Sequence, residues 1–543
     1  MPRRSFRSLS PLVFSLVLAA SGCTGNVGGS SSGATIASVV PDSGSTLGGT
    51  SVIISGANFQ SGATVKFGTA PAIGVAVDSA SQLSATSPPG TAGSVAVTVT
   101  NPGGQFAVLP NAFTYDACSV PSTVTSNLTL DASCVWTVSQ TVVVAGPNSP
   151  VLTVQPGTTV TFASGSPVTA LRVGVDAPGS LLANGTSAAP VIFTSGSATP
   201  DAGDWGGIVL GPQSTGSSIA YTTVEYAGGS GANDLQETAA LTVEGGDVVG
   251  TSPGSSASPM LTQLTISSSA GHGLVFAGLN AGFGAGSADI TVTSWEMTAH
   301  YPFVLEANQG ATVPTSLSAP STPPGLTAGV AFRSYVNSEC NVVTSQTWQP
   351  LSLPILAECS IGIGSASGPV ATLTISAPNT LKFAPSTELD VDPEALGSGL
   401  LQANGKDSSS GAIVFTSSLA LPDAGAWGGL NFNVVQAGQG GSSLTYATVN
   451  YANSTLLAPP PSYGTGAISV SNATGNANAL TGPTIANCAI QSYPSYGIAL
   501  VDISSGNFTS YGQDNTFATP GMTVSSFCSE VGEPNCTDTG AGP

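Results

Sequence analysis

The chain alternates apolar and polar positions in many short runs, and this period of two is typical of β-strands with one buried face. In the run SVIISGANF, Val52 and Ile54 share one face, and SVAVTVT repeats the pattern with Val95, Val97 and Val99. Similar runs, rich in Val, Ile, Phe and Thr and bounded by Gly, Pro, Ser or Asn, continue along the remaining sequence. No 3.6-residue period of an amphipathic helix intervenes. The pattern therefore predicts an all-β protein.

The runs that follow residue 116 occur twice, about 220 residues apart. The matching pairs are LTVQPGTTVTF (152–162) with LTISAPNTLKF (373–383), VIFTS (191–195) with IVFTS (413–417), and YTTVEYA (221–227) with YATVNYA (446–452). A solenoid winds the chain around itself and so supplies the crossovers that parallel strands need. The repeat predicts a right-handed parallel β-helix in two tandem related units, residues 116–335 and 336–543, the second truncated at its C-terminal end.

The phrase PDAGDWGG (200–207) returns as PDAGAWGG (422–429). Proline, aspartate and glycine predict a turn, and the paired glycines allow a close backbone approach. Asp204 is replaced by Ala426, so its carboxylate is dispensable to the turn. Trp205 is kept as Trp427. We interpret both indoles as packing residues that cover a coil, and a sugar-binding platform is the alternative role for them.

Residues 35–115 resemble an IPT/TIG immunoglobulin-like domain. The resemblance rests on Pro41, Gly44, Gly48-Gly49-Thr50, Gly56, Asn58-Phe59, Phe67-Gly68, Asn101-Pro102-Gly103-Gly104 and Phe113. It implies a β-sandwich, which we interpret as a stalk. The repeated unit resembles the β-helical repeats of bacterial surface proteins, and this resemblance implies a fold rather than an activity.

The first 22 residues have the composition of an export signal. Arg3, Arg4 and Arg7 precede the apolar stretch PLVFSLVLAA, which is too short to span a membrane. The segment ends in ASGC, which resembles a bacterial lipobox and implies cleavage before a lipidated Cys23. The alternative is an ordinary signal peptide cut near Ala20. We expect residues 23–34 to form a flexible tether to the outer membrane of a Gram-negative bacterium.

The charge of the chain excludes one class of partner. The sequence holds 8 Lys and Arg against 28 Asp and Glu, and only 7% of its residues are charged. Removing the three arginines of the leader gives 5 − 28 = −23 for the exported chain. Because a phosphate backbone requires a cationic surface, nucleic acid is excluded as a partner.

Seven cysteines remain after Cys23. The spacing predicts three disulfides in an exported protein, Cys118–Cys134, Cys340–Cys359 and Cys528–Cys536. The first two lie near the start of each unit, where a β-helix needs a cap. Cys488 aligns with Leu264 and is expected to be a buried free thiol.

Evidence for catalysis in the sequence is weak. The run AGHG around His272 resembles a Gly-His-Gly motif of polygalacturonase-like hydrolases, but the chain has no Asp-Asp dipeptide. Three candidate groups change in the second unit: Asp204, Glu225 and His272 become Ala426, Asn450 and Tyr496. The basic residues of the β-helical part, Arg172, Arg333, Lys382 and Lys406, form no recognisable constellation, and the second histidine is His300.

One acidic segment is a candidate cation site. DVDPE places Asp390, Asp392 and Glu394 at alternate positions, and Ca²⁺ prefers such oxygen ligands. A solvated acidic turn is the simpler interpretation. No other metal site and no cofactor are expected.

These observations favour a surface-anchored structural or binding lipoprotein, with adhesion or the binding of a glycan or extracellular polymer as its role. The expected partners are a polysaccharide or a component of a cell surface or matrix. The alternative is a polysaccharide lyase or glycoside hydrolase of the β-helical type with a diverged active site.

Overall fold

The structure is a computed structural model, and it divides the chain into two compact units, Met1–Asp116 and Ala117–Pro543. It describes residues 33–116, 118–165, 167–232, 237–246, 256–278, 280–297, 299–320, 328–334, 340–366, 369–392, 396–406, 411–433, 441–453, 466–471, 482–494, 496–501 and 515–518. The expected signal peptide, Cys23, the pair Cys528–Cys536 and Glu394 lie outside the described residues. No helix among the described residues has the length and apolar character needed to cross a membrane.

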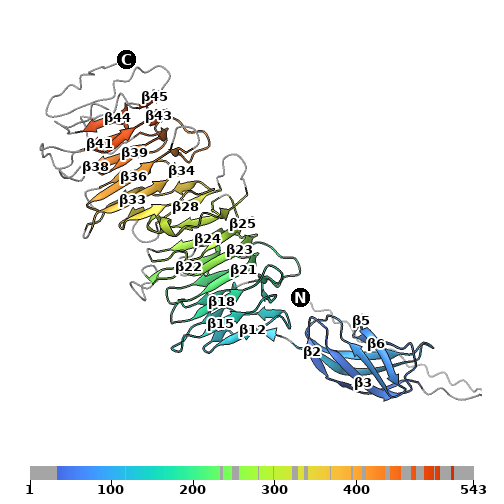
Figure 1. Ribbon diagram of the computed structural model, residues 1–543. Helices are drawn as coiled ribbons and strands as arrows, with labels where there is room; N and C mark the ends of the chain where they lie inside the picture. Colours follow the sequence, from blue (N-terminus) through green and yellow to red (C-terminus); the bar gives the residue numbers. More distant parts are fainter. Residues whose placement is uncertain are drawn as a thin grey trace, which may run out of the picture. The chain divides into compact units, whose positions relative to one another are not determined.

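The first unit is a sandwich of two sheets (Figure 1). The antiparallel four-stranded sheet has the order β1 (Thr35–Val40), β3 (Ser51–Ala57), β7 (Gln82–Thr86), β6 (Ile73–Ser79). The five-stranded sheet has the order β2 (Ser43–Ser45), β9 (Phe106–Asp116), β8 (Gly93–Thr100), β4 (Thr64–Phe67), β5 (Ala70–Pro71). The predicted alternation is confirmed, because Val52, Ile54, Val97 and Val99 are buried between the sheets.

The second unit is a parallel β-helix whose coils contribute strands to three faces (Figure 1). One sheet of 14 strands, here called the continuous sheet, runs through both repeats. Its strands in order are β11 (Thr123–Val124), β14 (Val142–Val144), β17 (Leu171–Val173), β20 (Ile208–Leu210), β22 (Ala239–Glu244), β24 (His272–Ala277), β26 (Phe303–Leu305), β28 (Val330–Phe332), β31 (Ile355–Ala357), β34 (Asn379–Phe383), β37 (Ile413–Ser417), β40 (Ala447–Asn450), β43 (Ala489–Gln491) and β45 (Thr516–Ala518).

The other two faces of the first repeat form a single sheet of 11 strands. One face contains β12 (Leu128–Leu130), β15 (Val151–Val154) and β18 (Ser180–Asn184). The other contains β10 (Cys118–Ser119), β13 (Trp136–Val138), β16 (Thr159–Phe162), β19 (Val191–Ser195), β25 (Ala288–Val292) and β27 (Leu317–Ser318). The long strand β21 (Ser218–Glu225) pairs with both β18 and β19, and so joins the faces; β23 (Met260–Ser267) stacks on β21.

In the second repeat the corresponding faces form separate sheets. The five-stranded sheet contains β30 (Gln346–Trp348), β33 (Ala371–Ser376), β36 (Gly399–Asn404), β39 (Ser443–Thr445) and β42 (Thr484–Ala486). The six-stranded sheet contains β29 (Cys340–Val342), β32 (Ile361–Ile363), β35 (Glu388–Val391), β38 (Gly429–Asn433), β41 (Gly466–Ser471) and β44 (Tyr496–Val501). The 3-10 helix η1 (Ala307–Thr312) contacts β29 and β30 at the junction.

The two repeats are offset by one face. By sequence, β16 corresponds to β34 and β19 corresponds to β37. The first member of each pair lies in the 11-stranded sheet, but the second member lies in the continuous sheet. The continuous sheet crosses the junction because β28 pairs with β31. Strands that are equivalent in sequence therefore face in different directions in the two repeats, although one apolar core extends from Val120 to Ile498.

The repeated phrase Y-x-T-V-x-Y is a strand with a corner at each end. Tyr221 and Tyr226 have φ of 46° and 59°, and Tyr446 and Tyr451 have φ of 49° and 60°. Positive φ is uncommon for non-glycine residues and turns the chain sharply between two faces. The corners and the alternating side chains between them give the phrase the same backbone path in both repeats.

The two disulfides predicted near the start of each repeat are confirmed. Cys118 lies on β10 and Cys134 comes two residues before the strand that pairs with β10. Cys340 and Cys359 have the same relation to β29 and β32. Each bond therefore ties one coil to the next, over sequence separations of 16 and 19 residues. Cys488 is a buried free cysteine, as its alignment with Leu264 predicted.

Candidate functional site

The two tryptophans considered as binding residues lie in the core. Trp205 has no exposed surface and stacks on Phe162 with ring centroids 3.9 Å apart; its Nε1–H donates to the Glu225 carbonyl at 2.8 Å. Trp427 is also buried, stacks on Phe383 at 4.3 Å, and donates to the carbonyl of the equivalent Asn450 at 2.7 Å. Because neither ring presents a face to solvent, both are packing residues, and they lie inside a coil rather than over its end.

The glycines of the repeated phrase are kept because of the backbone conformation. Gly203 and Gly207 have φ of 86° and 96°, and their counterparts Gly425 and Gly429 have φ of 82° and 92°. A side chain at Gly207 would meet the Ala239 carbonyl at 2.6 Å. All four positions therefore favour glycine by conformation, and Gly207 also requires it for space.

The substituted aspartate adds side-chain bonds to a turn that forms without it. Asp204 Oδ2 accepts hydrogen bonds from the hydroxyl of Ser195 and from the amide of Asp201. The same backbone bond from the fourth to the first residue of the turn occurs in both copies, from Asp204 and from Ala426. Asp204, Glu225 and His272 do not form a common site, since Glu225 lies on the 11-stranded sheet and His272 lies on the continuous sheet.

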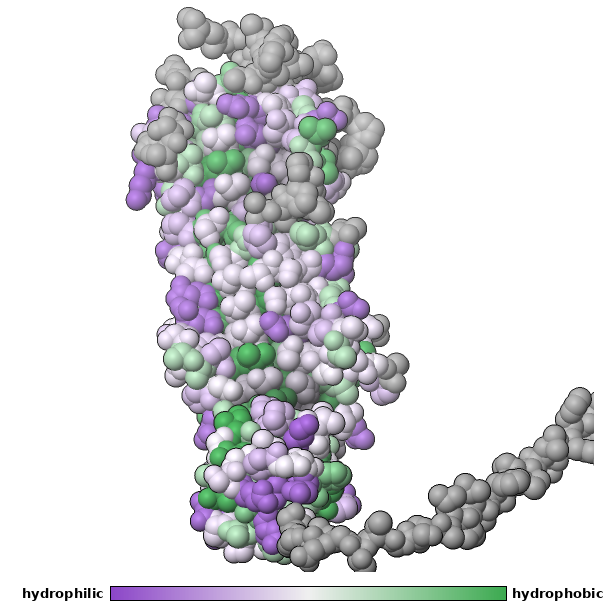
Figure 2. Space-filling model, turned by 90° about the vertical axis from the view of Figure 1, so that its right-hand side faces the viewer, coloured by the Kyte–Doolittle hydropathy of each residue, from purple (hydrophilic) through white to green (hydrophobic). Residues whose placement is uncertain are grey.

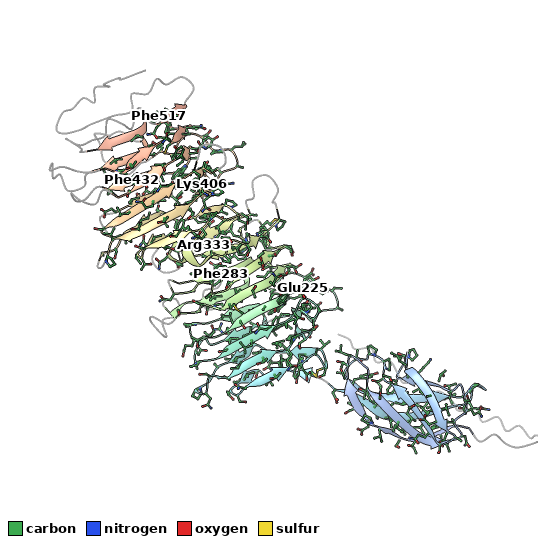
Figure 3. The ribbon with its side chains drawn as sticks, in the orientation of Figure 1. Glu225, Phe283, Arg333, Lys406, Phe432 and Phe517 are labelled. Carbon is green, nitrogen blue, oxygen red and sulfur yellow. A yellow bond between two sulfur atoms is a disulfide. The ribbon has the colours of Figure 1, made fainter. Side chains whose placement is uncertain are left out.

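The sequence showed no recognisable catalytic constellation around the basic residues, but the structure places Arg333 in a group of polar side chains. Arg333 lies at the junction of the repeats, between Phe283 and Lys406 in Figure 3. It belongs to a group here called the polar cluster, which consists of Glu237, His272, His300, Tyr301, Arg333 and Glu358. The members come from five segments up to 121 residues apart (237 to 358), so no local motif could have revealed them.

Arg333 is held between two carboxylates. Its Nη2 and Nε lie 2.7 and 2.8 Å from Glu358 Oε2, and its Nη1 lies 3.5 Å from Glu237 Oε1. The hydroxyl of Tyr301 donates to the other oxygen of Glu358. Burial, followed by this carboxylate, raises the pKa of Tyr301, so the phenol stays protonated. Arg333 is thus neutralised within the protein.

His272 is buried, with 1% of its side chain exposed. Its Nδ1 accepts the backbone N–H of Tyr301 at 2.8 Å, and its Nε2 faces Glu237 Oε2 at 3.5 Å. Burial lowers the pKa of His272, although Glu237 opposes this effect. The interaction with His272 is the main cause that lowers the pKa of Glu237. At neutral pH the pair is therefore a neutral imidazole beside an ionised carboxylate, and Nε2 makes no hydrogen bond among the described residues.

The polar cluster is better suited to joining coils than to catalysis. A lyase requires a base that can reach substrate, but Arg333 is paired with two carboxylates and His272 is inaccessible. The outer face of the continuous sheet beside the cluster is apolar and buried, and Tyr301 packs on it. His300 is also engaged, with Nδ1 2.7 Å from Glu296 and Nε2 3.1 Å from Thr238. The network links the last coils of the first repeat to the first coils of the second.

The candidate cation ligands occupy the six-stranded sheet. Asp390 Oδ1 and Glu388 Oε2 accept from the amide of Asn431 at 2.8 and 3.2 Å. Burial, and then the neighbouring Asp390, raise the pKa of Glu388 to about 7. Burial raises the pKa of Asp392 to about 6. Within the described ranges no three acidic, histidine or cysteine side chains converge as metal ligands, and Glu394 lies outside those ranges.

The first repeat presents a regular polar surface, here called the threonine face. The parallel register places threonines beside one another on the outer side of β13, β16, β19, β21, β23 and β25. They are Thr137, Thr159, Thr161, Thr194, Thr223, Thr265 and Thr291. Glu225, which accepts from Thr194 at 3.2 Å, lies on the right-hand edge in Figure 3, the side that Figure 2 turns toward the viewer. The middle part of this view is mostly pale, with scattered purple and green residues.

The fold and this surface define an all-β protein with an immunoglobulin-like unit followed by a β-helix. Residues 34–115 match the family model of the IPT/TIG domain, and residues 122–240 match that of the pectate-lyase-like β-helix domain. No curated protein matches the chain. The chain therefore carries an IPT/TIG domain followed by a pectate-lyase-like β-helix, a combination that fits a binding or polysaccharide-related role. With its disulfides, it indicates an exported protein.

Proposed function

We propose that this chain is a surface-anchored binding protein whose β-helix binds an extended neutral polymer, most simply a glycan. The threonine face is the observation that carries the proposal. Thr137, Thr161 and Thr194 stand in register on successive strands, as do Thr223, Thr265 and Thr291. Neighbouring strands are about 4.8 Å apart, so the hydroxyls form rows with a constant repeat. A polymer with its own regular hydroxyls can bind along such rows.

Three of the seven hydroxyls support the proposal by their hydrogen-bonding state, whereas Thr137, Thr161, Thr194 and Thr291 already bond within the protein. In the part of the chain that the structure describes, the side chains of Thr159, Thr223 and Thr265 make no hydrogen bond within the protein. Their donors and acceptors are available to a ligand. The threonines carry no charge, which favours a neutral polymer over a polyanion because the chain as a whole has a net charge of −20.

A pull-down with insoluble cellulose, xylan, β-glucan and chitin tests the proposal, with polygalacturonate as the acidic comparison. The protein is the exported chain with Cys23→Ser. Retention on a neutral polymer is expected, and Thr223→Val with Thr265→Val should weaken it, since valine keeps the shape but removes the hydroxyl. A matched pair of substitutions in the second repeat, Thr347→Val with Thr374→Val, controls for general effects on the fold. These two threonines also stand in register on neighbouring strands. Release of reducing ends or unsaturated products would instead favour an enzyme.

The proposed anchor is a lipid on Cys23. The arginines, the short apolar stretch and ASGC support it. Mass spectrometry of the N-terminus should detect an acylated cysteine, and Cys23→Ser should release the protein from the outer membrane. An unmodified N-terminus at another residue would contradict the anchor without affecting the polymer-binding proposal.

A further inference from the structure

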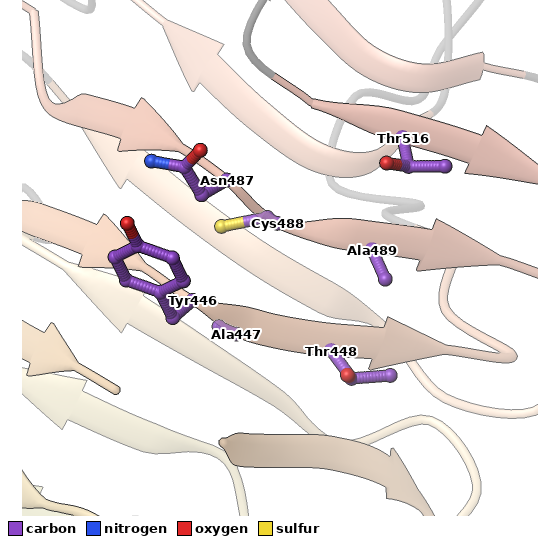
Figure 4. A pocket seen from close by; sticks show the side chains of 7 residues that line it. All are labelled: Tyr446, Ala447, Thr448, Asn487, Cys488, Ala489 and Thr516. Atoms are coloured by element: carbon purple, nitrogen blue, oxygen red, sulfur yellow. The ribbon is translucent and has the colours of Figure 1, made fainter. Parts of the chain in front are cut away.

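The corner at Tyr446 adjoins a hollow in the second repeat. The hollow has a volume of about 240 Å³ and is formed by the outer sides of β40, β43 and β45 (Figure 4). Tyr446 and Asn487 lie at one end of it, and Thr448, Ala489 and Thr516 stand on successive strands at the other. A hollow of this volume can hold one small polar ring.

The polar groups around the hollow are available to a ligand. In the described part of the chain, the side chains of Tyr446, Thr448, Asn487 and Thr516 make no hydrogen bond within the protein. None of the residues that line the hollow is charged. Binding sites for small ligands combine an apolar surface with a few polar groups that fix orientation. An uncharged hollow of this kind selects a neutral ligand with several hydroxyls.

Tyr446 supplies the apolar surface, and the fold alone does not explain its ring. The side chain is 36% exposed, so it contributes little to the core. Its φ of 49° costs a tyrosine on the order of 1 kcal/mol or more. The residue stacked on this corner, Asn487 at φ 56°, is of a type that tolerates the conformation better. An exposed aromatic ring kept in a costly conformation, next to unpaired hydroxyl and amide groups, is consistent with a ligand that stacks on the ring.

We infer that this hollow binds one neutral sugar ring of a glycan, with its C–H face on Tyr446 and its hydroxyls on Thr448, Asn487 and Thr516. This inference rests on the proposed function and names the part of the second repeat that contacts the polymer. The buried Cys488 forms the floor and takes no part in binding, since its thiol donates to the carbonyl of Leu444 at 3.3 Å.

The first repeat contains a matched control. Tyr221 occupies the equivalent corner, with φ of 46° and 39% exposure. The equivalent of Asn487 is Gln263, whose amide is already bound to Asp289 at 2.7 Å. Tyr221 therefore has the same ring and backbone as Tyr446, but its polar neighbour is occupied and a carboxylate lies next to it.

The experiment measures binding of cellohexaose, xylohexaose, laminarihexaose and chitohexaose to the Cys23→Ser chain by calorimetry, with hexagalacturonate as the acidic comparison. Tyr446→Asn should weaken binding of a neutral oligosaccharide about tenfold, which corresponds to about 1.4 kcal/mol. Tyr446→Phe should keep most of the affinity, and Tyr221→Asn should leave it unchanged. Since asparagine favours positive φ, Tyr446→Asn should not lower the melting temperature, so loss of binding will not reflect unfolding.

The outcomes separate this inference from the proposed function. If a neutral oligosaccharide binds, and Tyr446→Asn has no effect while Thr223→Val with Thr265→Val weakens binding, the hollow is not the sugar site. The proposal of polymer binding would then remain. Preference for hexagalacturonate would also overturn it, because a carboxylate has no cationic partner there. Absence of binding to every oligosaccharide and every polymer would overturn both.

Discussion

Replacing Trp205 by alanine should destabilise the first repeat locally. The indole is fully buried, stacks on Phe162 within 10° of parallel, and donates to the Glu225 carbonyl. Truncating a buried tryptophan costs about 3–5 kcal/mol. The Glu225 carbonyl, which loses its hydrogen-bond donor, adds about 1 kcal/mol to this cost. The expected loss is therefore about 4–6 kcal/mol, concentrated on the coils that contain β16, β19 and β21.

Native-state hydrogen exchange is the appropriate assay, because a solenoid does not unfold as a single two-state unit. Each 1.4 kcal/mol corresponds to a tenfold change, so amides of β16, β19 and β21 should exchange on the order of a thousandfold faster. Amides of β34 and β37 in the second repeat should be unaffected, because each coil contacts only its neighbours.

Trp136 provides the comparison. Its side chain is partly exposed, and its Nε1–H donates to the exposed carbonyl of Asp131 at 2.9 Å. Trp136→Ala should accelerate exchange much less than Trp205→Ala. Equal effects of the two substitutions, or uniform acceleration along both repeats, would refute the assignment of Trp205 to a local stacking role.

Four further predictions concern the second repeat and the junction. Replacing Cys340 and Cys359 by serine should lower the free energy of unfolding by about 3 kcal/mol, which is measured as a lower melting temperature. Cys488 should resist thiol reagents until the protein unfolds, because burial raises the pKa of its thiol to about 11. Glu388 has a pKa raised to about 7 in the folded protein, so its contribution to folding stability is greatest at low pH and is lost as pH rises through 7. The melting temperature should therefore fall between about pH 5 and about pH 8. The fall should be smaller in the Glu388→Gln variant. Arg333→Met should destabilise the junction more than Arg333→Met with Glu358→Gln, because the single change leaves a carboxylate unpaired; equal melting temperatures would contradict the ion-pair network.

The parts of the fold that the sequence predicted are those governed by local chemistry. Alternation placed Val52, Ile54, Val97 and Val99 in the sandwich core, and all four are buried there. The spacing of cysteines predicted both described disulfides, because each bond joins the beginning of one coil to the next. These features depend on side chains within about one coil of each other, and a period of two or a short separation is visible in the sequence.

The polar cluster and the offset between repeats depend on how the coils stack, and this stacking cannot be predicted from local sequence patterns. Coil lengths vary, so residues that stand side by side, such as His272 and Tyr301, have no fixed spacing. The offset separates the repeats at the junction, where η1 contacts β29 and β30. The hollow at Tyr446 was missed for a related reason. The phrase Y-x-T-V-x-Y was recognised as a repeat, but only the positive φ shows that its first tyrosine is a corner with an exposed ring.

The offset also constrains how a polymer could use both repeats. Thr223 and Thr265 lie on the 11-stranded sheet, whereas their counterparts Thr448 and Ala489 lie on the continuous sheet. A straight chain bound along the threonine face would therefore not continue onto the hollow at Tyr446, even though the two surfaces descend from one repeat. On the binding proposals above, the repeats contact separate segments of polymer. Linked sites of this kind gain avidity from a network of chains rather than from one extended strand.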